Sequence, residues 1–133
     1  MEVEAIRWAV QRMRSGQGRA LVTGPIHKGR LSAGGFAFKG HTDFLGHLCD
    51  ADPVMAFVGK KLRVALVTVH IPLRDVPAHL THERILHTVR AVHRASVSEL
   101  GLPNPSIALC GLNPHAGDQG ALGSEEIDII EPA

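Results

Sequence analysis

The stretch THERILHTVRAVHRASVSEL (residues 81–100), followed closely by SIALC (residues 106–110), decides the fold class of this chain. In the first part, apolar and small side chains recur at the spacing of one helix face, and Thr81 can cap the helix N-terminus. That face carries Ile85, Val89, Val92 and Ser96. Gly101 and two prolines end the helix, and SIALC has the pattern of a short buried strand. A helix that leads into a strand in this way is typical of an α/β fold.

The same alternation of helices and strands extends along the rest of the chain. We expect helices over Glu2–Met13 and around residues 41–50, and a final helix that starts at Ser124. Strand-like runs occupy Arg19–Thr23, residues 54–59 and residues 62–70, and the last two can pair as neighbours. This order predicts an α/β fold with a mostly parallel sheet flanked by helices, in a single domain over residues 1–133.

Composition excludes several classes of function. The net charge is +1, aromatic residues make up 4%, and no basic block occurs, so a nucleic-acid partner is not expected. The start of the chain lacks the pattern of a signal peptide, and the apolar run VALVTV is too short to cross a membrane. We therefore expect a soluble cytoplasmic domain, with Cys49 and Cys110 as reduced, buried thiols.

Nine histidines among 133 residues are the compositional outlier. Four of them lie in or beside the helix of residues 81–100, where we expect most to be solvated: His79, His82, His87 and His93. Three others stand beside Gly or Pro: His70 follows the alternating run Val64–Val69, His115 stands in the loop after the run Ser106–Cys110, and His41 is at a probable helix start. Because ligands bind at the carboxyl ends of strands in open α/β sheets, His70 and His115 are more suggestive than histidines on helices.

His70 and His115 are candidate ligands for a divalent metal. Neutral imidazole suits Zn²⁺ or a related ion, and catalytic sites use about three protein ligands together with an open position. Asp75, Asn113 and Asp118 lie nearby in sequence and are candidates for contacts to the ligands or the substrate. The alternative is that each histidine caps a loop or bonds a buried carbonyl, and no compact HExxH motif decides between the two.

His41 and Thr42 are candidates for an anion site at a helix N-terminus, where free N–H groups, a hydroxyl and an imidazole converge. The alternative is that Thr42 only assists helix initiation. In TGPIHKG (residues 23–29), Lys28 could contact a phosphate, but a turn accounts for the same residues. Neither GxGxxG nor GxSxG occurs, so no standard dinucleotide fingerprint or nucleophile elbow is present.

Four ordered segments together resemble the 4-hydroxythreonine-4-phosphate dehydrogenase family of the vitamin B6 pathway. They are LVTGPIHKG, GHTDFL, LRVALVTVHIPLRDV and GLNPHAGDQGALGSEEIDII, which cover most of the chain. The resemblance implies a partial isocitrate/isopropylmalate dehydrogenase-like fold. Family members are much longer at both ends, so we expect the chain to be the central part of a longer dehydrogenase or a truncated homologue.

The resemblance also implies a reaction and roles for residues. Family members use NAD (or NADP) and a divalent metal, with Zn²⁺ favoured over Mg²⁺ or Co²⁺, to oxidise and decarboxylate 4-phosphooxy-threonine to 3-amino-2-oxopropyl phosphate. His70 and His115 match metal ligands, and His41 and Thr42 match substrate-contacting positions. The implied partners are a small phosphorylated substrate and a second copy in a homodimer, with neither nucleic acid nor membrane.

Two other functions stay open at this point. The chain could belong to a dehydrogenase of another 4-phosphorylated hydroxy acid, because the motifs do not distinguish such relatives. It could also be a non-catalytic truncated module that keeps a metal or phosphate site.

Overall fold

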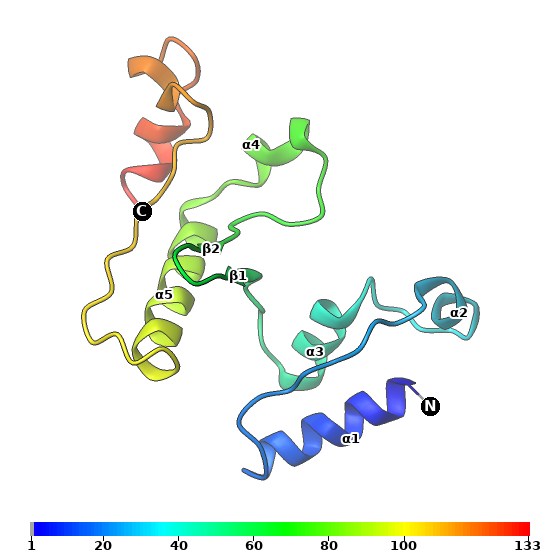
Figure 1. Ribbon diagram of the computed structural model, residues 1–133. Coiled ribbons are helices and arrows are strands. Elements are labelled where there is room, and N and C mark those ends of the chain that lie inside the picture. The colour runs from blue at the N-terminus through cyan, green and yellow to red at the C-terminus, as the bar shows by residue number, and fades with distance from the viewer. Residues whose placement is uncertain (1) are drawn as a thin grey trace. The chain divides into compact units, whose positions relative to one another are not determined.

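The computed structural model describes residues 2–133, apart from the side chains of Lys28, Leu31 and Ser32. The chain forms two compact units, Met1–Pro53 and Val54–Ala133. Figure 1 shows the helices, strands and connections within each unit. The assignment of residues 1–133 to a single domain stays a prediction.

The first unit is helical. It contains α1 (Glu2–Arg14), α2 (Lys28–Ala33) and α3 (His41–Cys49). In α1, acidic residues occupy the first turn and basic residues the last, which complements the helix dipole. The predictions of helices at the N-terminus and around residues 41–50 are confirmed.

An aromatic cluster forms the core of the first unit. Phe44 of α3 is completely buried, and its ring centroid lies 5.1 Å from that of Phe36 and 5.0 Å from that of Phe38. Ile6 and Val10 of α1 are buried in the same cluster. These contacts hold α1 and α3 together, and the Arg14 guanidinium adds a 3.0 Å hydrogen bond to the carbonyl of Leu48.

The second unit is built around one long helix. Its elements are β1 (Ala56–Val58), β2 (Arg63–Ala65), η1 (Leu73–Asp75), α4 (Val76–His79), α5 (His82–Ser98), η2 (Ala116–Gln119) and η3 (Glu126–Ile130). The hydroxyl of Thr81 accepts a hydrogen bond from the N–H of Arg84 at 3.2 Å, so the predicted cap of α5 is confirmed. Ile85, Thr88 and Ser96 are buried along α5. The predicted final helix is a single turn of π-helix, η3.

The sheet differs from the prediction. Strands β1 and β2 pair as predicted, but they form an antiparallel hairpin with Ala56 opposite Ala65. Residues 19–23 and 106–110, expected as strands, have no regular structure, and the described residues form no parallel sheet. A strand needs a hydrogen-bonded neighbour, and within residues 2–133 these segments have none. The hairpin forms because its two strands are brought together by a short turn, where the Gly59 N–H bonds the Leu62 carbonyl at 2.9 Å.

The cysteine prediction is correct in one respect and wrong in another. Cys49 and Cys110 are free, but both are exposed. Cys49 is the last residue of α3, and Cys110 lies in an extended segment that no described residue covers well enough to bury it. Of the four histidines expected to be solvated, His79, His82 and His93 are exposed and His87 is half-buried.

None of the helices formed by residues 2–133 is both long and apolar enough to cross a membrane.

We predict that Phe44→Ala destabilises the first unit by about 3–5 kcal/mol, the usual cost of removing a buried phenylalanine. Trp8 of α1 is the only tryptophan of the chain, so its fluorescence during urea unfolding reports on this unit. The control is Val22→Ala in the same unit, because Val22 is 93% exposed and the substitution should change the free energy of unfolding by at most about 0.5 kcal/mol. Equal losses from the two substitutions would contradict the aromatic cluster as the core.

Candidate functional site

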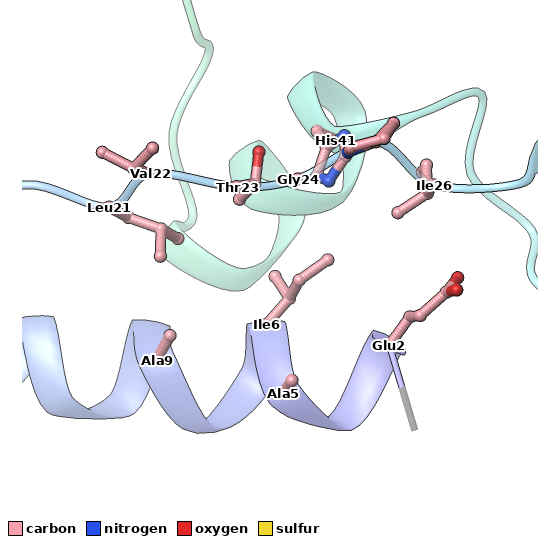
Figure 2. Close-up of a pocket in the computed structure, with 11 residues that line it drawn as sticks. Glu2, Ala5, Ile6, Ala9, Leu21, Val22, Thr23, Gly24, Ile26 and His41 are labelled. Atoms are coloured by element: carbon pink, nitrogen blue, oxygen red, sulfur yellow. The ribbon is translucent and has the colours of Figure 1, made fainter.

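A cavity of about 330 Å³ lies in the first unit between α1, the extended segment of residues 21–26 and the start of α3. Figure 2 shows Ile6 pointing from α1 toward this segment, with Leu21 and Ile26 pointing back toward the helix. The lining is mainly apolar, with Glu2, Thr23 and His41 as its polar side chains. The cavity therefore offers a few hydrogen-bonding groups on an apolar wall, which is typical of small-molecule sites.

His41 carries a buried polar atom at this cavity that lacks a partner. It is the first residue of α3, after Gly40 in an extended conformation, and the Asp43 carboxylate accepts a hydrogen bond from the Lys39 N–H at 3.2 Å. The His41 Nε2 atom is buried, and no described residue bonds it. Thr42 follows it and is half-buried. Because buried polar atoms are usually hydrogen-bonded, Nε2 is suited to bond a ligand.

Lys28 and Asp75 are two further predicted contacts. The side chain of Lys28 lies outside what the structure describes, so its predicted phosphate contact is not tested. Asp75 ends η1 and lies 3.7 Å from the Nε atom of its neighbour Arg74. Its backbone carbonyl lies 2.8 Å from Nδ1 of His79, within hydrogen-bonding distance.

His70 is exposed and has a backbone φ of 56°. Residues other than glycine rarely adopt this left-handed conformation, which costs about 1–2 kcal/mol. Such strain often marks a functional position, because it persists only where the surroundings enforce it. The conformation fits a residue that turns the chain sharply after the segment of residues 66–69.

The loop of residues 111–123, here called the His115 loop, is held by hydrogen bonds to Asn113. The Asn113 Oδ1 atom accepts the N–H groups of His115 at 2.9 Å and Gly117 at 3.4 Å, and its Nδ2 atom donates to the Leu122 carbonyl at 3.1 Å. Asn113 thus shapes the backbone around His115. The His115 side chain is exposed, and its carbonyl accepts the Asp118 N–H at 3.0 Å.

Consecutive residues of the His115 loop have positive φ angles: Ala116, Gly117, Asp118, Gln119 and Gly120. Gly117 is also buried. A Cβ atom at Gly117 would lie 2.6 Å from the carbonyl oxygen of Gly123 and 2.8 Å from Oε2 of Glu126. Only glycine fits this position, for reasons of both conformation and space.

The described residues do not form a complete metal site. Among residues 2–133, no group of three or more His, Cys, Asp or Glu side chains is arranged to hold an ion. His70 and His115 carry the right donor atoms, but a catalytic zinc site needs about three protein ligands. Both histidines belong to the second unit, whereas His41 and Thr42 belong to the first.

Sequence reasoning missed two features of these sites. The sequence places Glu126 only within the final helix predicted to start at Ser124, but its carboxyl group is buried and bonds the His115 loop. The apolar cavity beside α1 also went unnoticed, because its wall residues look like ordinary core positions. The three closely spaced glycines after His115 were the one signal in the sequence that other groups, such as the Glu126 carboxylate, pack closely against the loop backbone.

Comparisons with known proteins give one consistent answer. The model of the family described as "Pyridoxal phosphate biosynthetic protein PdxA" matches residues 1–133. The chain is 46% identical over 132 residues to the 4-hydroxythreonine-4-phosphate dehydrogenase of Colwellia psychrerythraea, with 98% of this chain and 40% of the relative covered. It is 47% identical over 131 residues to the enzyme of that name from Pseudomonas putida, with the same coverage.

Solved structures with the same description are also similar. The crystal structure of the Klebsiella pneumoniae enzyme matches with a TM-score of 0.89 and 37% identity, covering 98% of this chain and 39% of that one. A putative enzyme from Salmonella typhimurium matches with a TM-score of 0.86 and 30% identity, covering 98% and 40%. The chain therefore spans about 40% of the length of the relatives that it matches.

We predict that Gly117→Ala destabilises the second unit more than Gly101→Ala does. Both glycines have positive φ, so each substitution should cost about 1–2 kcal/mol for conformation. At Gly101 a Cβ atom would meet nothing within 4 Å, whereas at Gly117 it would overlap Gly123 and Glu126. Urea unfolding of the two variants, followed by circular dichroism, measures the difference, and equal losses would show that the loop packs more loosely than described.

Proposed function

The chain belongs to the family of the pyridoxal phosphate biosynthetic protein PdxA, and from this premise we propose that it is part of a 4-hydroxythreonine-4-phosphate dehydrogenase. The observation that carries the proposal is the match of the family model across residues 1–133. The proposed reaction is the oxidation, with decarboxylation, of 4-phosphooxy-threonine to 3-amino-2-oxopropyl phosphate. NAD, or alternatively NADP, accepts the hydride.

We propose that His41 and Thr42 contact the phosphorylated substrate. Two observations support this role: the buried Nε2 atom of His41 has no partner among the described residues, and His41 lines the cavity beside α1. The start of α3 adds N–H groups that the helix itself leaves unbonded. An imidazole N–H, a hydroxyl and a helix N-terminus together suit an anionic group. Lys28, whose segment follows the cavity wall, is proposed as a further contact to the phosphate.

We propose that His70 and His115 are two ligands of a divalent metal, with Zn²⁺ favoured over Mg²⁺ or Co²⁺. The strained backbone of His70 and the ordered loop around His115 support this role. Among residues 2–133 no group of three or more His, Cys, Asp or Glu side chains is arranged to hold an ion, so only these two ligands are proposed. When bound, such an ion stabilises negative charge on a substrate oxygen. Asp75, Asn113 and Asp118 are proposed as supporting residues, with Asn113 acting on the loop backbone.

The remaining proposals concern the complete protein. The segments at residues 19–23 and 106–110 are proposed to join a mostly parallel sheet, as in an isocitrate/isopropylmalate dehydrogenase-like fold, once further strands are available to pair with them. A cytoplasmic homodimer is proposed as the working form. The exposed apolar side chains of the hairpin, among them Phe57, Val58 and Leu62, support the idea that more polypeptide covers this region.

For the metal site, we predict that His70→Ala and His115→Ala each weaken Zn²⁺ binding by at least about tenfold, since even residues that only support a ligand contribute that much. Titration calorimetry on the 133-residue chain measures the affinity. The matched control is His93→Ala on α5, because His93 is exposed and outside the proposed set. If both variants bind Zn²⁺ as tightly as the unaltered chain, or if His93→Ala loses as much affinity as they do, His70 and His115 are not the metal ligands.

For the reaction, we predict that the longest product of the gene reduces NAD with 4-phosphooxy-threonine and a divalent metal, as followed by the absorbance of the reduced cofactor. In that protein, His41→Ala should raise KM by about tenfold or more, because a hydrogen bond to a charged group contributes roughly 1.5–3 kcal/mol. His93→Ala again serves as the control. No turnover by either the chain or the longer product would refute the proposed activity, and a preference for a substrate without the amino group would assign another phosphorylated hydroxy acid.

A further inference from the structure

Glu126 is a buried acidic residue that the proposed reaction does not use. It is the first residue of η3, and the residue is only 7% exposed. Its Oε1 atom accepts a hydrogen bond from the backbone N–H of Leu112 at 2.7 Å, across 14 residues of sequence. Glu126 therefore joins the end of the chain to the first residues of the His115 loop.

The carboxyl group of Glu126 also packs against the middle of the same loop. Gly117 has no side chain, and a Cβ atom built there would lie 2.8 Å from the Glu126 Oε2 atom. The glycine thus leaves the space into which the carboxyl group fits. One side chain contacts the loop at two points, before and after His115.

Leu112 is linked to His115 through the neighbouring residue Asn113. Leu112, which Glu126 holds, precedes Asn113 in the chain. The Asn113 side chain accepts the N–H groups of His115 and Gly117, and it donates to the Leu122 carbonyl. Fixing the backbone of Leu112 therefore restricts the residue whose amide shapes the turn at His115.

The second oxygen of Glu126 shows why a carboxyl group at this position is unusual. Oε2 is buried, and no described residue bonds it. Burying an unbonded polar atom is unfavourable, whereas an aliphatic side chain of similar size would fill the space without that cost. The benefit of a carboxyl group here lies in the hydrogen bond that Oε1 accepts from Leu112.

We propose that Glu126 is a positioning residue that anchors the His115 loop and thereby holds His115 in place for its ligand. The inference rests on the proposed function only for the role of His115, and the anchoring itself is independent of it. The contacts of Glu126 described above are with the loop backbone at Leu112 and Gly117, so it acts through the loop.

The test compares Glu126→Leu with Glu126→Gln. Leucine removes the acceptor, whereas glutamine keeps a carbonyl oxygen for the Leu112 N–H and adds a donor at the other position. The matched control is Glu131→Leu, which removes an exposed carboxyl group just after η3. Amide hydrogen exchange without metal reports the order of the loop at Leu112, His115 and Gly117, and the amide of Val89 in α5 reports the rest of the unit.

In Glu126→Leu we expect the three loop amides to exchange about tenfold faster or more, as the loss of one buried hydrogen bond implies, with Val89 unchanged. Glu126→Gln and Glu131→Leu should exchange as the unaltered chain does. Unaltered loop exchange in Glu126→Leu would overturn the anchoring role. If Glu126→Leu unfolds the whole unit, the result for Glu126→Gln decides. Faster loop exchange in Glu126→Gln, which keeps the acceptor oxygen, would show that this oxygen is not the anchor.

A second measurement separates positioning from simple loop stability. Zn²⁺ affinity should fall in Glu126→Leu, recover in Glu126→Gln, and fall no further when His115→Ala is added to Glu126→Leu. A disordered loop that keeps its full His115-dependent affinity would overturn the positioning role. If the unaltered chain shows no His115-dependent binding, the proposed metal site fails, and the exchange measurement still decides the anchoring.

Discussion

Backbone hydrogen bonding governs which parts of this chain form regular structure, because every buried N–H and C=O group needs a hydrogen-bond partner. A helix bonds its own backbone, so α1, α3 and α5 form wherever apolar spacing and capping favour them. A strand depends on a neighbour, and among residues 2–133 only β1 and β2 provide one for each other. Residues 19–23 and 106–110 have strand-like sequences but join no sheet, because no described segment pairs with them.

Side-chain packing then fixes the helices within each unit. In the first unit, Phe44 and its aromatic neighbours hold α3 against α1, and the extended segment of residues 21–26 forms one wall of the cavity beside α1. This arrangement leaves the Nε2 atom of His41 buried but unbonded. The packing that makes the core is thus also what makes a hydrogen-bonding position available to a ligand.

The His115 loop obeys a different principle, because polar contacts rather than apolar packing determine its shape. The Asn113 side chain bonds the backbone at His115, Gly117 and Leu122, and Glu126 reaches the loop from η3. The run of positive φ angles is strained, and these bonds help to maintain it. A loop held in this way can present an exposed histidine in a defined place, which a flexible loop cannot do.

The sequence alone determined the features that depend on neighbours within a few residues. The positions of α1, α3 and α5, the Thr81 cap and the pairing of β1 with β2 all follow from local periodicity, capping and a short turn. The four ordered motifs also indicated the family from the sequence alone, and the family model confirms it. Only the tertiary structure decided the absence of a parallel sheet among residues 2–133, the exposure of both cysteines, and the approach of Glu126 to Gly117. These features depend on which distant segments are present to pair, cover or contact one another, and no local pattern encodes that.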